Sequence, residues 1–425
     1  MTGGDQDESS KFQEAIDYAY QQGLTLFIPQ GRYTADGLVL RNGSRLLGTG
    51  PEQSVIHAVP GSENSAVLRL DQGPLQHVII EHLGLEGAGN PGQHGFRARA
   101  ERGNQETSGM WHSSFSHMRI FNFDGAQLWL EGGGEDARDP IQFLVFNNMV
   151  LERKPQAPES IALLMSGQVN QTHWSGGRID AFGAASGGSP GVNLKICPQL
   201  TAYDASISGN TRYRSQKVGH THVFSGTTFQ QAELGVFVDQ AESISFDTCH
   251  FEGLANAVHF RGGIGRVDRG HFANSTVANP EQGFSIYASE GATVVGHGNM
   301  FIGTYGDMAR TDDSGAVVKL SGSYGADAST TVGLSHTVDA RSEISIGAAT
   351  TVVLEGSTAV RTINSRHFPG TTVVLRAGDR PITLQAGGNI GLVGDELSVN
   401  PGGTITLMRF DVGPEWAVVS TYGAV

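Results

Sequence analysis

Four residues in one short stretch of the chain have the types that cleavage of a glycosidic bond requires. The segment GVFVDQAESISFDTCHFEGLANAVHFRGG, residues 235–263, contains Asp239, Glu252, His259 and Arg261. Glycosidic hydrolysis uses two carboxyl groups, one protonated and one ionised, roughly 5 to 9 Å apart, and a neighbouring cation or imidazole tunes their pKa values. Because only a short turn separates Glu252 from His259, we expect Asp239, Glu252 and His259 to share one groove as catalytic residues.

Asp180, in the segment HWSGGRIDAFG, is the next carboxylate candidate. Both Glu252 and Asp180 also have a simpler interpretation. Glu252 belongs to an FEG pattern that can cap a turn, and Asp180 can accept hydrogen bonds from the backbone amides of its own turn. The residue pattern leaves both interpretations open.

Apolar runs in the middle of the chain carry aromatic and charged residues at alternate positions. Successive side chains of a strand point to opposite faces, so an apolar inner row sends its neighbours outward. The outward residues that we expect to bind substrate are Arg69, Trp129, Glu131, Lys195, Arg261 and Tyr287. Aromatic platforms with a few placed polar groups suit an extended glycan, and the excess of cations, on a chain of net charge −14, favours an anionic one. The alternative is an ordinary surface ladder whose charges pair between strands.

A second chemistry would use other members of the same set. β-Elimination on an acidic polysaccharide needs a base for the proton next to the carboxylate and a cation for the anion that forms. Lys195, His259, Arg261 and Tyr287 supply these types. We expect no metal and no cofactor, because no close trio of acidic residues marks a calcium site and His220 and His222 lack an evident third ligand.

Only one segment of the chain is predicted to be helical. In SSKFQEAIDYAYQQG, residues 9–23, apolar residues recur at helical spacing, Ser10 and Gln13 fit a capping box, and Gly23 can end the helix. The segments that follow are short, apolar and bounded by Gly, Pro or Asn, as strands are.

From about residue 80 the chain repeats one pattern at irregular intervals. Large apolar residues anchor the repeats at Leu85, Ile120, Leu151, Ile179, Ile207, Phe229, Phe251, Phe272 and Phe301. Each unit also holds a second apolar run, such as AQLWLEGG or NAVHFRGG. Neither run can bury its inner face alone, whereas stacked turns form one continuous core. The pattern therefore predicts an all-β protein, a single-stranded parallel β-helix with loops of varying length.

The segment GGDQDESSKFQEAIDYAYQQGLTLFIPQGRYTADGLVLRNGSRLLGTG resembles the start of right-handed β-helices of the pectate-lyase-like superfamily. The coils, for example ISFDTCHFEGLANAVHF, look like those of phage tailspikes and polysaccharide depolymerases. The resemblance implies a right-handed helix with an N-terminal capping helix, a homotrimer, and an extracellular or virion-tail location. The superfamily includes lyases, hydrolases, epimerases and non-enzymes, so the resemblance is weak for chemistry. The chain departs from the commoner Gly-Asp-Gly…Asp-Asp turn and lacks the Tyr-Gly-x-Asp-Pro-His signature of alginate epimerases.

Composition and strand spacing complete the expected organisation. Glycine makes up 59 of 425 residues and charged residues only 16%, which suits a protein rich in tight turns. The negative net charge argues against a nucleic-acid partner, no apolar stretch approaches 18 residues, and two cysteines provide no disulfide framework. We expect an N-terminal cap over residues 1–50, coils over 51–328 and a small β-sandwich-like domain over 329–425.

These features together favour a depolymerase of a bacterial surface polysaccharide that acts by hydrolysis between paired carboxylates. The alternatives are a polysaccharide lyase that uses the basic residues and Tyr287, and a glycan-binding spike without turnover.

Overall fold

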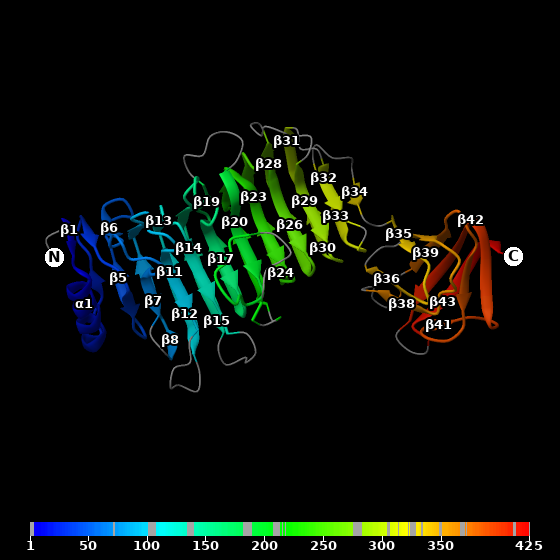
Figure 1. Ribbon diagram of the computed structural model, residues 1–425, viewed down its shortest axis with the longest axis horizontal. Coiled ribbons are helices and arrows are strands. Elements are labelled where there is room, and N and C mark those ends of the chain that lie inside the picture. Colours follow the sequence, from blue (N-terminus) through cyan, green and yellow to red (C-terminus); the bar gives the residue numbers. More distant parts are fainter. Residues whose placement is uncertain are drawn as a thin grey trace.

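The structure is a computed structural model of the 425-residue chain. It describes all residues except 1–3, 71–72, 101–107, 134–139, 182–188, 207–212, 215, 217, 275–282, 304–306, 313, 322, 324–328, 333–334, 348–350, 366–369, 371, 411–413 and 425. Figure 1 shows an elongated stack of strands followed by a smaller C-terminal part.

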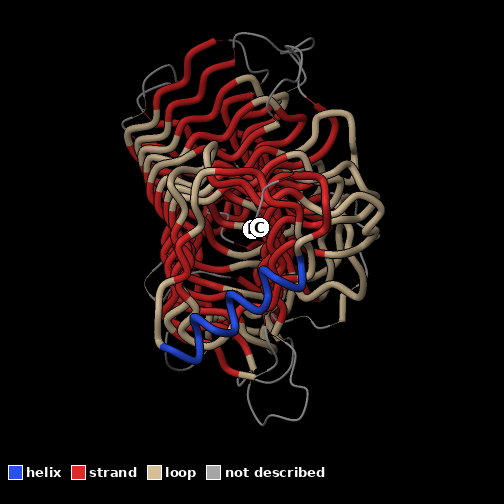
Figure 2. Tube along the Cα trace, turned by 90° about the vertical axis from the view of Figure 1, so that its left-hand side faces the viewer, coloured by secondary structure: helices blue, strands red, loops and turns tan. Residues whose placement is uncertain are grey.

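One helix, α1 (Ser9–Gln22), lies across the N-terminal end of the stack, as Figure 2 shows. It buries Phe12, Ile16 and Ala19, so its apolar side caps a core that would otherwise be open to water. Gly23 ends the helix in the left-handed conformation, with φ of 66°. The capping box predicted for Ser10 and Gln13 is wrong, because the N-cap is Glu8, two residues before Ser10, and it makes no side-chain hydrogen bond to the helix end.

The main body is a right-handed parallel β-helix of three sheets, as the sequence predicts. Sheet A contains, in spatial order, β1 (Gly4–Asp7), β3 (Gly31–Thr34), β6 (Ser54–His57), β10 (Gly84–Glu86), β13 (Arg119–Phe121), β16 (Val150–Glu152), β19 (Arg178–Asp180), β22 (Thr228–Gln230), β25 (His250–Glu252), β28 (His271–Asn274) and β31 (Met300–Gly303). Sheet B contains β2 (Leu26–Phe27), β5 (Arg45–Leu47), β9 (Ile79–Glu81), β12 (Gly109–Ser116), β15 (Ile141–Asn147), β18 (Val169–Ser175), β21 (His220–Ser225), β24 (Glu242–Asp247), β27 (Ile264–Asp268), β30 (Thr293–His297), β33 (Val317–Ser321) and β34 (Ser329–Val332), with β8 (Pro74–Gln76) beside β12. Sheet C contains β4 (Leu38–Leu40), β7 (Ala66–Leu70), β11 (His94–Arg99), β14 (Ala126–Glu131), β17 (Ile161–Ser166), β20 (Ser189–Cys197), β23 (Ala232–Asp239), β26 (Asn256–Arg261), β29 (Phe284–Ser289) and β32 (Asp307–Thr311).

The predicted repeat anchors form one inward column of sheet A. The column runs through Leu85, Ile120, Leu151, Ile179, Phe229, Phe251, Phe272 and Phe301 in direct strand register. Its aromatic members stack, with the rings of Phe251 and Phe272 4.6 Å apart, and each such pair contributes about 0.5 to 1.5 kcal/mol beyond its buried area. Each short strand therefore gains its stability from the coils above and below it.

One predicted anchor does not belong to this column. Ile207 lies outside the described residues, and β19 pairs directly with β22, so that Ile179 is opposite Phe229. The segment between β20 and β21, residues 198–219, is therefore an insert that leaves a single coil and returns to the next one.

The corner between sheets B and A explains part of the glycine content. From β9 onward each of its turns contains a left-handed residue. Examples are His82, His117, Asn148, Gly176, Gly226 and Thr248, all with φ between 49° and 64°. At the adjacent Gly177 a Cβ atom would lie 2.1 Å from the Met149 carbonyl oxygen. Such corners need glycine, or a residue that tolerates the left-handed region.

The C-terminal part has a core of its own around the buried Trp416. Its larger sheet contains β35 (Ser335–Asp339), β37 (Thr351–Glu355), β39 (Thr372–Ala377), β42 (Glu396–Arg409), β43 (Trp416–Ala424) and β41 (Ile390–Gly391), with β40 (Ile382–Gln385) beside β42. The smaller sheet pairs β36 (Glu343–Gly347) with β38 (Thr362–Ser365). Parallel pairing continues through β35, β37 and β39 before the antiparallel strands β42 and β43. Among the described residues no helix is long and apolar enough to cross a membrane.

Candidate functional site

The outer face of sheet C collects most of the side chains that the sequence singles out. Its central outward column runs through Val39, Arg69, Arg97, Trp129, Leu164, Lys195, Phe237, His259, Tyr287 and Arg310. A parallel column near the end of the strands includes Glu131, Ser166, Cys197, Asp239, Arg261 and Ser289. Strand register thus places Arg69, Trp129, Glu131, Lys195, Asp239, His259, Arg261 and Tyr287 on one face.

The 198–219 insert covers the middle of this face. Lys195 is fully buried, and its Nζ donates to the carbonyl oxygens of Asp204 at 3.1 Å and Ser206 at 2.5 Å. Trp129 is also buried, beneath Tyr203 of the insert, with ring centroids 5.4 Å apart. The expected contact of Trp129 and Lys195 with a glycan is therefore contradicted, because both side chains already pack against the protein's own chain.

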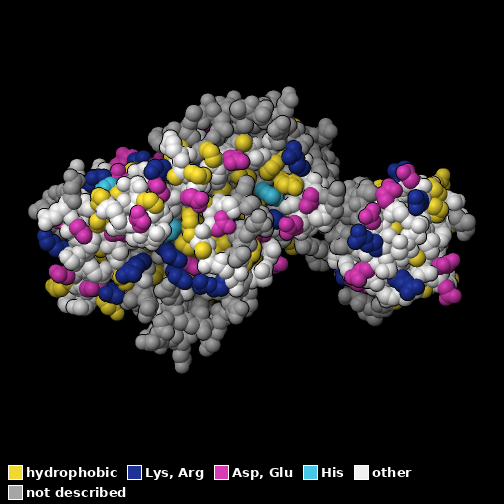
Figure 3. All heavy atoms as spheres, in the orientation of Figure 1, with side chains coloured by type: hydrophobic (Ala, Val, Ile, Leu, Met, Phe, Trp, Pro, Cys, Tyr) yellow, Lys and Arg dark blue, Asp and Glu magenta, His cyan; other side chains and the backbone are white. Residues whose placement is uncertain are grey.

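The part of the face that precedes the insert is basic. Arg97 lies over the Trp129 ring, 4.0 Å from its centroid, and donates to Glu131 at 2.8 Å. Arg99 approaches the same carboxylate at 3.5 Å, and Arg69, one strand earlier, is exposed. Figure 3 shows Lys and Arg side chains gathered on the N-terminal half of this side of the molecule. Glu131 is buried under its arginines and holds them in place, so it is not available as a free acceptor for substrate.

Beyond the insert, the same face becomes aromatic. The imidazole of His259 stacks on Tyr287 with centroids 4.4 Å apart, and Phe237 and Phe284 lie 5.2 and 6.1 Å from it. His259 Nε2 is 2.9 Å from the Ser289 hydroxyl. Burial, assisted by the nearby Arg261 guanidinium, lowers the pKa of His259 to about 4, so its imidazole is neutral near pH 7.

Burial also raises the pKa of Tyr287, whose phenol therefore keeps its proton. The next residue of the column, Arg310, lies over the ring of Phe284 at 5.7 Å. A neutral imidazole, a protonated phenol and a guanidinium thus follow one another on consecutive strands of sheet C.

Asp239 is a buried partner rather than an exposed carboxylate. Its two oxygens accept hydrogen bonds from Arg261, at 3.1 Å from Nε and 2.5 Å from Nη2, and Tyr213 of the insert donates to the same group. The Asp239 side chain is fully buried. The hydrogen bonds from Arg261 to Asp239 raise the pKa of Arg261. Burial, together with the hydrogen bond to Asp239, raises the pKa of Tyr213. Asp239 therefore fixes Arg261 and Tyr213 in position and has no oxygen exposed to a substrate.

The expected pairing of Asp239 with Glu252 is wrong. Glu252 is exposed on sheet A, opposite Gln230 and Ala273, whereas Asp239 ends a strand of sheet C at the corner that leads to sheet B. A six-residue sheet C strand, about 20 Å long, separates the two corners. Glu252 and His259 are close in sequence, but this does not bring Glu252 near Asp239. The chain must first run along a sheet C strand, from the corner beside sheet A to the corner beside sheet B.

Asp180 lies on sheet A too, in the same outward column as Glu252 and two strands away. It is fully buried. Arg178 Nε approaches it at 2.7 Å, and the Gln230 amide donates to it at 3.1 Å. These contacts make Asp180 part of a ladder of ion pairs, with no place for a reacting sugar.

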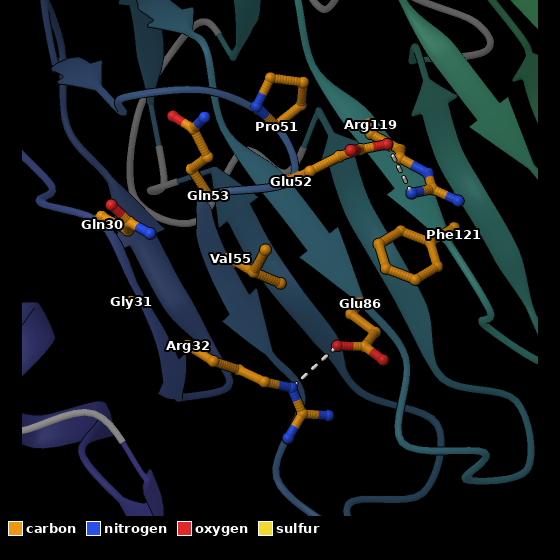
Figure 4. A pocket seen from close by; sticks show the side chains of 10 residues that line it. All are labelled: Gln30, Gly31, Arg32, Pro51, Glu52, Gln53, Val55, Glu86, Arg119 and Phe121. Carbon is orange, nitrogen blue, oxygen red and sulfur yellow. Dashed lines mark hydrogen bonds and ion pairs between the residues drawn. The ribbon is translucent and has the colours of Figure 1, made fainter.

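The same ladder borders a hollow of about 520 Å³ on the outside of sheet A, shown in Figure 4. In it Arg32 donates to Glu86 at 2.9 Å, and Arg119 contacts Glu52 at 3.2 Å and Glu152 at 2.7 Å. The His57 hydrogen bond, followed by that from Arg32, lowers the pKa of Glu86 to about 2. Glu86 thus stays ionised near neutral pH, so it cannot serve as the general acid of a glycosidase.

Three polar residues around His259, Tyr287 and Arg261 were not predicted as site residues, namely Ser289, Arg310 and Tyr213. Alternation along the strand of Tyr287 would have found Ser289, two residues later, and applied one coil further it would have found Arg310. Tyr213 has no such signal, since it reaches the site from an insert without strand periodicity. Within the described residues, no group of three His, Cys, Asp or Glu side chains is arranged to hold a metal ion.

Comparison with known proteins yields no family model and no curated protein that matches the chain. Solved structures with partial likeness include the catalytic unit of a GH87 α-1,3-glucanase from Streptomyces thermodiastaticus, 17% identical, over 86% of this chain and 61% of that one, with a TM-score of 0.43. Geobacillus virus E2 ORF18 is 11% identical over 100% and 74% of the two chains, with a TM-score of 0.41. The Azotobacter vinelandii mannuronan C-5 epimerase AlgE6 A-module is 15% identical over 77% and 97%, with a TM-score of 0.36. Likeness at this level adds nothing to the fold that strand pairing establishes.

Proposed function

We propose that the protein binds an acidic polysaccharide on the outer face of sheet C, beyond the insert, and cleaves it by β-elimination. The observation that supports this most strongly is the stack of His259 on Tyr287 at 4.4 Å, with Ser289, Arg261 and Arg310 around it. The cluster combines a proton acceptor, a proton donor and cations on one half-buried surface.

The residues match the steps of the reaction. The proton on the carbon next to the uronate carboxylate passes to neutral His259, whose lowered pKa leaves a ring nitrogen without a proton near pH 7. The electron pair forms a carbon–carbon double bond, and the bond to the glycosidic oxygen breaks. Tyr287 then protonates the leaving oxygen, since its raised pKa keeps the phenol protonated until that step.

The uronate carboxylate needs a cation that stabilises the negative charge formed when the proton leaves. Arg310 follows Tyr287 in the outward column and is the residue we assign to this carboxylate. Arg261 is bound by Asp239, so its role is to hold Tyr213 and to help keep His259 neutral.

β-Elimination replaces hydrolysis as the preferred chemistry because Asp239 and Glu252 do not meet. We retain the proposal that the substrate is a bacterial surface polysaccharide and the protein an extracellular or virion-tail homotrimer, for which the sequence resemblance to tailspikes is the support. A glycan-binding spike without turnover would use the same aromatic surface.

Two single substitutions and one control substitution test the proposal. His259→Gln and Tyr287→Phe should abolish cleavage of acidic polysaccharides while retaining binding. His173→Gln, at an exposed position of sheet B, is the control and should cleave like the parent protein. Full activity in both site variants would overturn the assignment of the site, and binding by the parent protein without cleavage of any polymer would favour the spike.

A further inference from the structure

The 198–219 insert occupies a surface that the coils otherwise leave apolar. Ala126, Leu164 and Val192 point outward from sheet C and are buried in one cluster with Leu200 and Ala205 of the insert. Outward apolar side chains on a coil need a cover, because exposing them to water is unfavourable. The described residues of the insert are therefore held against sheet C by the burial of this cluster.

Polar contacts hold the described residues of the insert on both sides. Toward the N-terminus, Tyr203 packs on His94 at 4.9 Å, and its hydroxyl donates to the Glu159 carbonyl. In the middle, the insert supplies the two carbonyl oxygens that accept the buried Lys195 ammonium. Displacing the insert would break both hydrogen bonds of the Lys195 ammonium and expose the apolar cluster beside it to water, which is unfavourable.

On its other side, the insert reaches the strand that carries His259. Tyr213 accepts a hydrogen bond from Arg261 at 3.1 Å and donates to Asp239. Among the strands that the structure describes, sheet C continues beyond β26 with β29 and β32 alone. With strands about 4.8 Å apart, the outward surface between the insert and the last strand of sheet C is only about 10 to 15 Å long.

We propose that the insert ends the glycan path beside His259, so that the site accepts the end of a polysaccharide chain and releases short oligosaccharides of uniform length. This inference rests on the proposed function, since it concerns how the same site meets its substrate. Without the insert, the outward surface of sheet C would continue to the arginines around Arg97 and would allow a chain to pass through.

Binding stoichiometry tests the inference without any turnover. The His259→Gln variant is titrated into polygalacturonate and alginate fractions of increasing length, and the complexes are weighed by light scattering. End binding predicts that the number of proteins per polymer chain stays constant as the chains lengthen. A number that rises in proportion to chain length would overturn the inference and leave the proposed function intact, whereas no binding to any acidic polymer would overturn both.

The product distribution of the parent protein gives a second test. We expect short products from the first time points, while the bulk polymer keeps most of its length. An early, broad range of intermediate sizes would contradict the inference. For a variant with residues 201–216 replaced by a short Gly-Ser link, the product sizes should shift toward that broad range. If this variant fails to fold, the binding stoichiometry and the product sizes of the protein with its insert still test the inference.

Discussion

The imidazole of His259 and the phenol ring of Tyr287 stack at 4.4 Å with 24° between their planes, although they come from successive coils. The coil geometry makes this contact, because strands of sheet C align the two residues in one outward column. Burial of the imidazole, followed by the charge of Arg261, lowers the pKa of His259, because both disfavour the imidazolium.

The pH at which cleavage declines on the acid side should reflect the burial of His259. If neutral His259 accepts the proton, the rate of cleavage should stay high well below the ordinary histidine pKa of 6.5 and fall as the pH drops through about 4. The measurement is kcat/KM against pH on a substrate whose own carboxylates remain ionised. A fall centred near pH 6.5 would assign the base to another, exposed group.

Asp239→Asn should destabilise the protein strongly. The Asp239 side chain is fully buried and that of Arg261 is 13% exposed, and loss of one partner of a buried ion pair typically costs about 3 to 5 kcal/mol of unfolding free energy. Asp247→Asn is the matched control, because its partner Arg269 is largely exposed, and it should barely change the melting temperature. Equal, small shifts in the two variants would show that Asp239 is not needed to hold Arg261.

Glu252→Gln should leave both activity and stability close to those of the parent protein. Glu252 is exposed on sheet A, and its one described side-chain contact is with His250 at 3.3 Å. Kinetic assays and thermal melts check this. Loss of turnover with normal binding and folding would restore hydrolysis by carboxylates as the chemistry.

Acid should weaken the fold through buried neutral histidines. Burial lowers the pKa of His222 to about 3, whereas the unfolded chain protonates this residue near 6.5. The unfolded state therefore binds more protons, so the contribution of His222 to stability is complete above pH 6.5 and declines from there toward about 3. His94, with a pKa lowered to about 3 by burial, acts in the same direction.

Denaturant unfolding of His222→Gln against pH measures this effect. The variant loses the contact between His222 Nδ1 and the Thr172 hydroxyl, 2.8 Å apart, so it should be less stable at neutral pH. Its stability should nevertheless fall less steeply between pH 6.5 and 4 than that of the exposed control His173→Gln. Parallel curves for the two variants would exclude His222 as the titrating group.

Much of the fold follows from periodicity that the sequence displays directly. The inward column of sheet A was predictable because each coil repeats one large apolar residue in the same local pattern, as at Phe229, Phe251 and Phe272. Ile207 fitted that pattern by residue type alone, and it lies outside the described residues. Only the direct pairing of Ile179 with Phe229 distinguishes an insert from a coil.

The site residues were predictable only where the alternation of side chains along a strand decides which face of sheet C they occupy. Alternation placed His259, Arg261 and Tyr287 on one face, and strand register brings them together. It could not predict the burial of Lys195, because the covering insert lacks periodicity. Nor could it show that Glu252 lies on sheet A while Asp239 lies at the far end of a sheet C strand, since that depends on which of three sheets each strand joins.

The most direct test of the account is the mass of the new chain ends that the protein produces from an acidic polysaccharide. Hydrolysis adds one water across each broken linkage, whereas β-elimination adds none and leaves an unsaturated uronate. We predict products lighter by one water than hydrolysis products, with the ultraviolet absorbance of the new double bond, and none of them from His259→Gln. Hydrated ends without that absorbance would contradict the central claim that the His259–Tyr287 cluster carries out elimination.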